Sequence, residues 1–155
     1  MAERIDTLVI LGAGGDLTGR LLLPGVASYL ASSQAQTITV VGADRTEFTP
    51  AAWRDRVATA FAAYPSRLAT SVAAHSHYVQ VDATDPESLR ALLDGLNGRI
   101  ALYFALPPAI AERAVQALAH IELPRGIVFA LEKPFGTDLP SAMALNRLLE
   151  TVLPE

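Results

Sequence analysis

The sequence has no cysteine among its 155 residues. It therefore has no disulfide framework, no thiolate metal cluster and no cysteine nucleophile, a composition that fits a reducing compartment. Charged residues are also scarce, at 18 %, and the 12 Lys and Arg against 16 Asp and Glu give a net charge of −4. This balance argues against a nucleic-acid partner, because such proteins need clustered cations to displace counterions.

Long hydrophobic runs are missing as well. The longest uncharged stretch, 21–43, is interrupted by Pro24, Gly25 and several Ser and Gln residues, whereas a membrane span needs roughly 20 nearly continuous apolar residues. Residues 1–6 lack the charged-then-apolar layout of a secretory signal. With 51 % hydrophobic residues, the chain can bury the core of one domain. We expect a soluble, cytoplasmic protein with no membrane contact.

Short apolar runs alternate with longer segments of helical periodicity. The runs are typical of strands covered on both faces and span 7–12, 37–42, 78–82, 100–105 and 127–131. The expected helices are 24–32, 50–64, one begun by 84–87, one from 107 or 108 to 119, and 139–152, while 66–76 fits a helix or a loop. This order predicts an α/β fold, a doubly wound parallel sheet with helices on both faces, as one domain over 1–155. Ligands of such sheets bind outside the carboxyl ends of the strands.

The first predicted strand ends in a glycine-rich turn, Gly12-Ala13-Gly14-Gly15-Asp16-Leu17. Glycine lets a phosphate approach the backbone, and the start of the following helix offers free N–H donors. Leu17 stands where the full G-x-G-x-x-G pattern has its last glycine. An ordinary strand-to-helix turn is the alternative, but a position after the first strand favours dinucleotide binding through bare amides. The charge of Asp16 is wrong for facing a phosphate, so we expect it to bond to backbone or ribose.

The second predicted strand is followed by Asp44 and Arg45. An acid here accepts hydrogen bonds from the adenosine ribose and repels a 2′-phosphate, whereas an arginine pairs with that phosphate. A solvated loop pair is the alternative. Because both residue types are present, the residues alone leave NADP and NAD open as cofactors.

Two further strand ends carry distinctive residues. The fourth strand leads into Ala105-Leu106-Pro107 and a second proline, which suits either an apolar wall beside a nicotinamide ring or a simple helix start. The fifth ends in Glu132-Lys133-Pro134, where a lysine at the carboxyl edge can donate to a hydroxyl or phosphate.

Two histidines, His75 and His77, have the spacing of side chains that face the same side of a strand. Since no third ligand lies nearby in the sequence, we predict no metal site.

The sequence resembles the glucose-6-phosphate dehydrogenases in four segments: the glycine turn, the strand end 42–45, and the segments 105–108 and 132–136. The resemblance covers essentially the whole chain and corresponds to the amino-terminal Rossmann-type coenzyme domain of that family. The resemblance implies hydride transfer from the sugar C1 hydroxyl of a sugar phosphate to NADP. It implies that 12–17 hold the pyrophosphate, that Arg45 holds the 2′-phosphate, and that 105–107 bind the cofactor. It places Asp82 and Ala83 on the adenosine side, and Lys133 at both the substrate and the nicotinamide, with Pro134 cis.

Two features depart from the family pattern. Leu21 stands where the family usually has a substrate-binding lysine in an R-K-L-x-P-like run, which suggests an altered substrate or weak activity. The chain also stops at Glu155, before the family's R-I-D-H-Y-L-G-K-E-like segment and its large antiparallel domain. We therefore expect the catalytic and substrate domain, with its general-base histidine and any oligomer contacts, to lie outside this chain, and we expect no turnover by the chain alone.

Two alternatives stay open. Sugar oxidoreductases of the Gfo/Idh type also combine an amino-terminal Rossmann domain with an E-K-P strand end, although the G-D-L turn favours the first family. A non-catalytic nucleotide-binding module on the same fold is the other, because a fold does not determine function. Lys133 argues mildly against this module, and Leu21 argues mildly for it.

Overall fold

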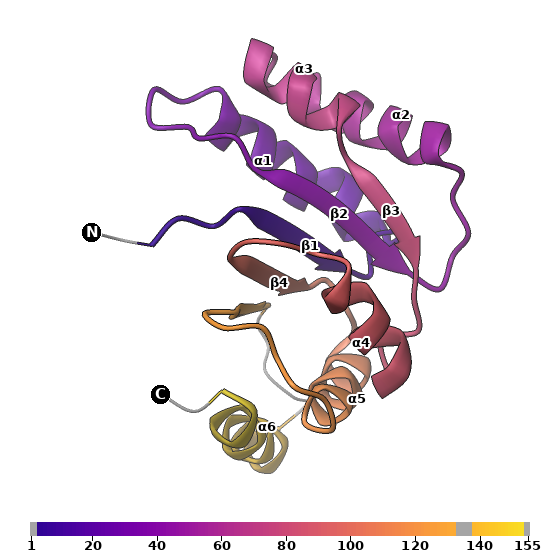
Figure 1. The fold of residues 1–155 in the computed structure, drawn as a ribbon, viewed down its shortest axis with the longest axis vertical. Helices are drawn as coiled ribbons and strands as arrows, with labels where there is room; N and C mark the ends of the chain where they lie inside the picture. Colours follow the sequence, from indigo (N-terminus) through magenta and orange to yellow (C-terminus); the bar gives the residue numbers. More distant parts are fainter. Residues whose placement is uncertain (1–2, 133–137, 154–155) are drawn as a thin grey trace.

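The predicted strands form a single parallel sheet in the computed structural model, which describes residues 3–132 and 138–153. The strands lie in the order β3-β2-β1-β4-β5 (Figure 1). Their bounds are β1 Thr7–Leu11, β2 Thr39–Asp44, β3 His77–Gln80, β4 Ile100–Phe104 and β5 Val128–Leu131. The doubly wound sheet is confirmed, and the second strand begins and ends two residues later than predicted.

Helical segments connect the strands. They are η1 Thr18–Leu22, α1 Leu23–Leu30, α2 Pro50–Phe61, α3 Arg67–Ala74, α4 Pro86–Asp94, α5 Pro108–Leu118 and α6 Leu139–Val152. The ambiguous stretch 66–76 is thus mainly helix α3. The sequence did not predict η1, a short π-helix that runs directly into α1. The expected helix starts are confirmed at Asp85 and Asp138, whose carboxylates accept the amides of Ser88 and Ser141, as helix caps do.

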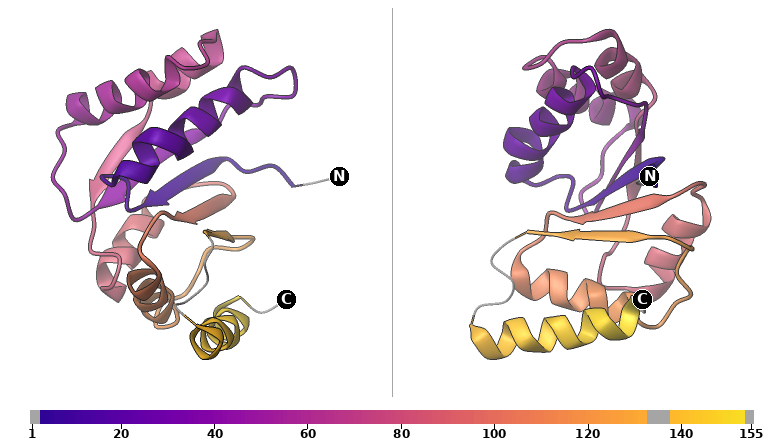
Figure 2. Two further views of the ribbon diagram at one scale, coloured as in Figure 1. Left: turned by 180° about the vertical axis from the view of Figure 1, so that it is seen from behind. Right: turned by 90° about the vertical axis from the view of Figure 1, so that its left-hand side faces the viewer.

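The helices cover the sheet on both faces, with α1, α2 and α3 on one side and α4, α5 and α6 on the other (Figures 1 and 2). Successive strand residues point to opposite faces. Ile10 and Val40 accordingly pack with α1–α3, while Val9 and Val41 pack with α4–α6. The connections change from one face to the other between β3 and β4, which places a switch point between the adjacent strands β1 and β4.

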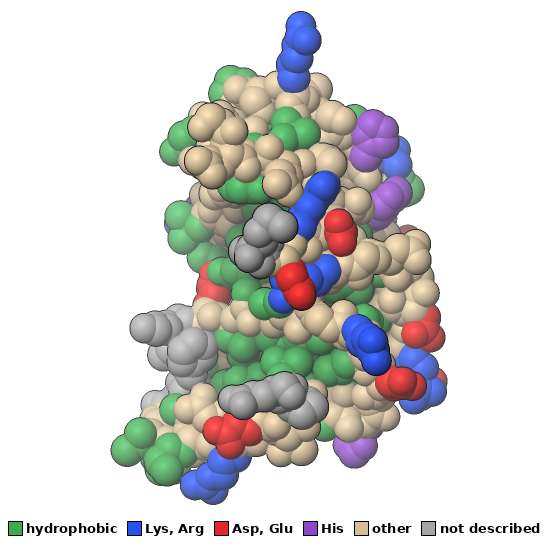
Figure 3. Space-filling model, turned by 60° about the vertical axis from the view of Figure 1, so that its left-hand side comes forward, with side chains coloured by type: hydrophobic (Ala, Val, Ile, Leu, Met, Phe, Trp, Pro, Cys, Tyr) green, Lys and Arg blue, Asp and Glu red, His purple; other side chains and the backbone are tan. Residues whose placement is uncertain are grey.

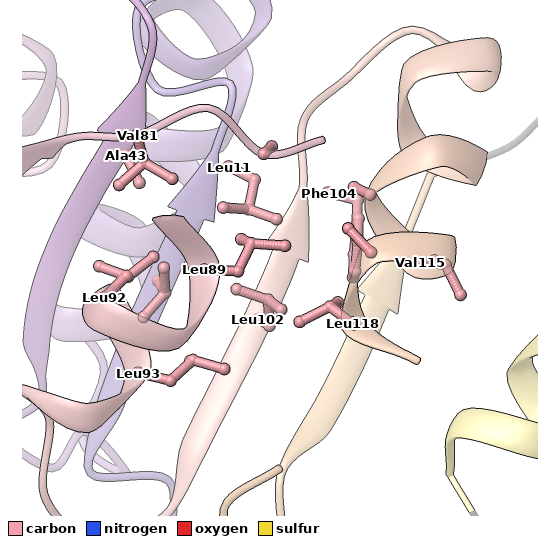
Figure 4. Close-up of a cluster of buried hydrophobic side chains, with 14 of the residues drawn as sticks. Leu11, Ala43, Val81, Leu89, Leu92, Leu93, Leu102, Phe104, Val115 and Leu118 are labelled. Carbon is pink, nitrogen blue, oxygen red and sulfur yellow. The ribbon is translucent and has the colours of Figure 1, made fainter. Parts of the chain in front are cut away.

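Helix α4 shows how periodicity builds this core. Leu89, Leu92 and Leu93 are buried and follow the three- and four-residue spacing of one helix face. Figure 4 shows them pointing from α4 into a cluster that includes Leu11 of β1 and Leu102 of β4. This packing fixes the carboxyl ends of the central strands, which carry the candidate site.

The α1–α3 face is less completely covered over β4. Tyr103 pairs in register with Ile10, so it lies on this face, yet it stays partly exposed. A band of hydrophobic side chains reaches the surface on the face shown in Figure 3. Among the described residues, no helix has the length and apolar character to cross a membrane.

Candidate functional site

A pocket of about 340 Å³ lies at the carboxyl edge of the sheet, where the ends of β1, β2, β3 and β4 meet. Crevices at a switch point are where doubly wound sheets bind ligands. Of the residues singled out from the sequence, those lining the pocket are Gly12, Asp44, Arg45, Asp82, Ala83, Leu106 and Pro107. The fold therefore brings together strand ends that are as far as 95 positions apart in the chain.

Gly12 closes the first strand against the fourth. Its φ of +85° is one that side chains disfavour, and a Cβ atom on it would stand 2.1 Å from the carbonyl oxygen of Ala105. Ala105 in turn donates its amide to the carbonyl of Leu11. Ala105 thus supports the turn through its backbone, while the neighbouring Leu106 and Pro107 line the pocket.

The expectation that the amides of Gly12 to Gly15 are bare is wrong. The amides of Gly12 and Ala13 both donate to the carbonyl of Ala43, at 2.9 and 3.3 Å, and that of Gly15 donates to the carbonyl of Gly12 at 3.0 Å. Buried backbone donors must find partners, and strand β2 supplies the acceptor for Gly12 and Ala13, while Gly15 bonds within the turn. The turn is therefore held closed by the chain itself.

The donors left for an anion lie one step further along the chain. Residues 16 and 17 are helical, and the first amides of a helix have no partner within it. The amides of Asp16 and Leu17 are not among those that donate within the described chain. The buried Thr18 hydroxyl donates to the carbonyl of Gly12 and so fixes the start of the helix against the turn. The first amides of a helix are donors of the kind that bind anions in proteins.

Asp16 behaves differently from the prediction. Its carboxylate pairs with Arg20 at 2.7 Å, one helical turn away, and both side chains are largely exposed. It accepts no backbone hydrogen bond within the described residues, so that part of the expectation is wrong, and its relation to a ribose stays a prediction. The side chain lines a separate hollow beside Arg56.

Asp44 ties the glycine turn to strand β2. One carboxylate oxygen, Oδ2, accepts the Gly14 amide at 2.8 Å, and the other, Oδ1, accepts the Arg45 amide at 2.7 Å. Each oxygen of a carboxylate can accept more than one hydrogen bond. Asp44 therefore positions the turn through two amides, and it keeps acceptor capacity for a ribose hydroxyl.

Replacing Asp44 with alanine is expected to lower the free energy of unfolding by about 1–2 kcal/mol, because two amides lose a charged acceptor in a partly exposed site. Asp44→Asn keeps a single acceptor oxygen and should lose roughly half as much. Urea denaturation of the two variants checks this order. An Asp44→Ala midpoint equal to that of the unaltered chain would contradict it.

Asp82 is held by Thr84, whose hydroxyl and amide both donate to Oδ1, at 2.7 and 2.9 Å. These bonds lower the pKa of Asp82 below its ordinary value, and the positive charges of Arg45 and Arg113 act in the same direction. Arg113 also lines the pocket, from helix α5. Arg113 was not predicted from the sequence. The available signal was its position three residues after Ile110, on a helix that starts at a strand end.

Another hollow, of about 700 Å³, lies on the α1–α3 face, and its lining includes Leu21, Tyr103 and Glu132. The Tyr103 hydroxyl donates to the Glu132 carboxylate. Burial and this bond to a negative group raise the pKa of Tyr103 to about 12. Leu21 is 63 % exposed there. Lys133 and Pro134, both assigned roles from the sequence, lie outside the described residues.

The two histidines do not share a strand. His75 ends helix α3, where its Nδ1 lies 2.8 Å from the carbonyl of Ser71, and His77 begins β3. The predicted alternation is therefore wrong, because the helix extends up to His75.

The doubly wound parallel sheet, its switch-point pocket and the glycine turn packed on β4 are the arrangement of a Rossmann-type domain. Residues 9–155 match the family described as glucose-6-phosphate dehydrogenase, NAD binding domain. The chain belongs to this family. That match favours the glucose-6-phosphate dehydrogenases over the Gfo/Idh alternative and supports a nicotinamide cofactor.

Individual relatives agree. The chain is 30 % identical to the glucose-6-phosphate 1-dehydrogenase of Zymomonas mobilis over 100 % of its own length and 34 % of the relative's. It is likewise 30 % identical to the Bacillus subtilis enzyme, covering 96 % of this chain and 33 % of that protein. The chain thus spans about a third of the length of these relatives.

Solved structures give the same result. A crystal structure of glucose-6-phosphate 1-dehydrogenase from Mycobacterium avium superposes with a TM-score of 0.83 at 28 % identity, over 98 % of this chain and 35 % of that one. A glucose-6-phosphate dehydrogenase in complex with glucose-6-phosphate superposes at 0.81 with 20 % identity, over 99 % of this chain and 36 % of that one. The second likeness shows the fold alone.

Proposed function

We propose that this chain binds NADP at the carboxyl edge of its sheet and that, in a protein of its relatives' length, it holds the coenzyme for oxidation of a sugar phosphate at C1. The observation that carries the proposal is the pocket that unites Gly12, Arg45 and Asp82. The helix that follows the glycine turn begins with Asp16 and Leu17, whose amides have no acceptor among the described residues. Together these groups match the parts of a dinucleotide phosphate: a diphosphate, a ribose and a 2′-phosphate.

Each group has a distinct task. The amides of Asp16 and Leu17 bind the diphosphate, because they point out of the first helical turn and carry the positive end of the helix dipole. Arg45 pairs with the 2′-phosphate. When bound, NADP supplies a nicotinamide ring that accepts a hydride. Leu106 and Pro107 wall the pocket beside Gly12 and exclude water from that side.

The sugar phosphate is proposed by family membership, with Lys133 as its contact in this chain. Two relatives that are 30 % identical to this chain are named glucose-6-phosphate 1-dehydrogenase. Leu21 offers no cation where the family usually has one, and it lies exposed in the same hollow as Glu132, the residue before Lys133. We infer that this protein binds its sugar phosphate more weakly, or binds a differently shaped one, than relatives that have the lysine.

Titration of the chain with NADPH, followed by cofactor fluorescence, tests the proposal directly. Saturable binding in the micromolar-to-millimolar range is expected, as is usual for enzymes and their small ligands. Absence of saturable binding of both NADPH and NADH would refute it. A longer protein that binds NADPH but transfers no hydride to or from any sugar would instead favour a non-catalytic nucleotide-binding module.

Arg45→Ala separates the two cofactors. The substitution should weaken NADPH binding by about 1.5–3 kcal/mol and leave NADH binding nearly unchanged, because only NADPH has the 2′-phosphate that the guanidinium pairs with. Arg147→Ala, at an exposed position on helix α6, removes the same charge and serves as the control. Equal losses for NADPH and NADH would show that the pairing is absent.

A further inference from the structure

A second arginine faces the same pocket as Arg45. Arg113 reaches it from helix α5, while Arg45 follows strand β2. Within residues 3–132 and 138–153, neither guanidinium forms an ion pair or a hydrogen bond. Arg113 follows Ile110 at the three-residue spacing that puts both on one side of the helix, and both line the pocket.

The two carboxylates of the pocket are already engaged by the chain. Asp44 accepts two backbone amides, through its two oxygens. Asp82 accepts the amide and hydroxyl of Thr84, both through Oδ1, and its Oδ2 accepts no hydrogen bond from the described residues. That oxygen can accept a ligand hydroxyl. The guanidinium donors of Arg45 and Arg113 also have no partner among the described residues, so the pocket offers two cationic groups with unused hydrogen-bonding capacity. A ligand group with several anionic oxygens matches this capacity best.

We propose that Arg113 is a specificity-determining residue that holds the 2′-phosphate of NADP together with Arg45. The inference rests on the proposed function. A phosphate dianion has three terminal oxygens, so guanidinium groups from two elements can pair with it at once. The negative charge of Asp44 by itself would disfavour a 2′-phosphate, and the positive charge of Arg113 offsets it.

Two ligands that differ only in the phosphate test this role, namely 2′-phospho-ADP-ribose and ADP-ribose. Calorimetric titration of Arg113→Gln should show about tenfold weaker binding of the first and less than about twofold weaker binding of the second, as loss of one charge-assisted pair predicts. Arg113→Lys should recover part of the loss, since it keeps the charge without the planar fork. Arg147→Gln, an equal charge change on exposed α6, should leave both affinities unchanged.

The alternative outcomes separate the hypotheses. Equal weakening of both ligands by Arg113→Gln would place Arg113 on the shared adenosine or diphosphate and overturn the proposal, as would no weakening at all. If the unaltered chain binds none of the four ligands (2′-phospho-ADP-ribose, ADP-ribose, NADPH and NADH), the proposed function itself fails, and the role of Arg113 fails with it. If Arg45→Gln selectively weakens 2′-phospho-ADP-ribose and Arg113→Gln does not, the proposed function stands and only the role of Arg113 is refuted.

Discussion

Gly12→Ala is expected to destabilise the protein by about 4 kcal/mol or more, a large part of the stability of a small domain. The new Cβ atom would lie 2.1 Å from the carbonyl oxygen and 2.8 Å from the carbonyl carbon of Ala105. Both are backbone atoms at the end of β4, so relief requires the two central strands to separate. The φ of +85° adds strain for any side chain. Urea denaturation, or failure to obtain folded protein, measures the effect.

Gly25→Ala is the matched control. This glycine lies near the start of helix α1, and a Cβ atom there would meet nothing within 4 Å. Alanine favours helix over glycine, so the change should stabilise the protein by about 0.5–1 kcal/mol. Should Gly12→Ala unfold within about 1 kcal/mol of the unaltered chain, the close approach of β1 and β4 that shapes the pocket would be wrong.

The fold was predictable because its signals are local. Continuous apolar runs mark strands buried on both faces, and caps such as Asp85 and Asp138 mark helix starts. The end of β2 was missed because Ala43 pairs with both β1 and β3, and Asp44 pairs with β3. These are long-range contacts that no local pattern reveals. The π-helical turn η1 was missed because the predicted helix began only at residue 24, whereas η1 spans Thr18–Leu22.

The site was less predictable than the fold. The sequence identified the strand ends that meet in the pocket, because parallel strands bring their carboxyl ends to one edge. It did not reveal which amides are free. The glycine amides are occupied by Ala43, Gly12 and Asp44. The amides without an acceptor in the described part of the chain are those at the helix start. Hydrogen-bond partners across 30 positions, such as Gly14 and Asp44, depend on the assembled sheet.

Arg56 shows the same limit. Its Nη2 donates to the carbonyl of Gly15 at 2.6 Å, across 41 positions of the chain. In the sequence it was one of several charged residues on a predicted helix. Only the packing of α2 beside the glycine turn makes it a support for the turn.

Trp53→Ala should have the second-largest effect, a loss of about 3–5 kcal/mol, the usual cost of truncating a large buried aromatic. Trp53 is 0 % exposed and packs so tightly on β2 that a Cβ atom on Gly42 would stand 2.5 Å from its ring. Its ring centroid is 5.3 Å from that of Tyr78 and 6.1 Å from that of Phe48. The chain has 1 Trp, so this substitution removes its tryptophan fluorescence. Denaturation should therefore be followed by circular dichroism.

Trp53→Phe distinguishes packing from the indole N–H. That N–H is buried without a partner in the described part of the chain, and an unpaired buried donor costs about 1–3 kcal/mol. Phenylalanine keeps an aromatic ring and removes the donor, so its loss should be under half that of alanine. Because Trp53 packs against β2 just before Asp44, Trp53→Ala should also weaken NADPH binding. Equal destabilisation by Trp53→Ala and Trp53→Phe would mean that packing of an aromatic ring on Gly42 contributes little to stability. Trp53 would then not support the strand that leads to Asp44 and Arg45.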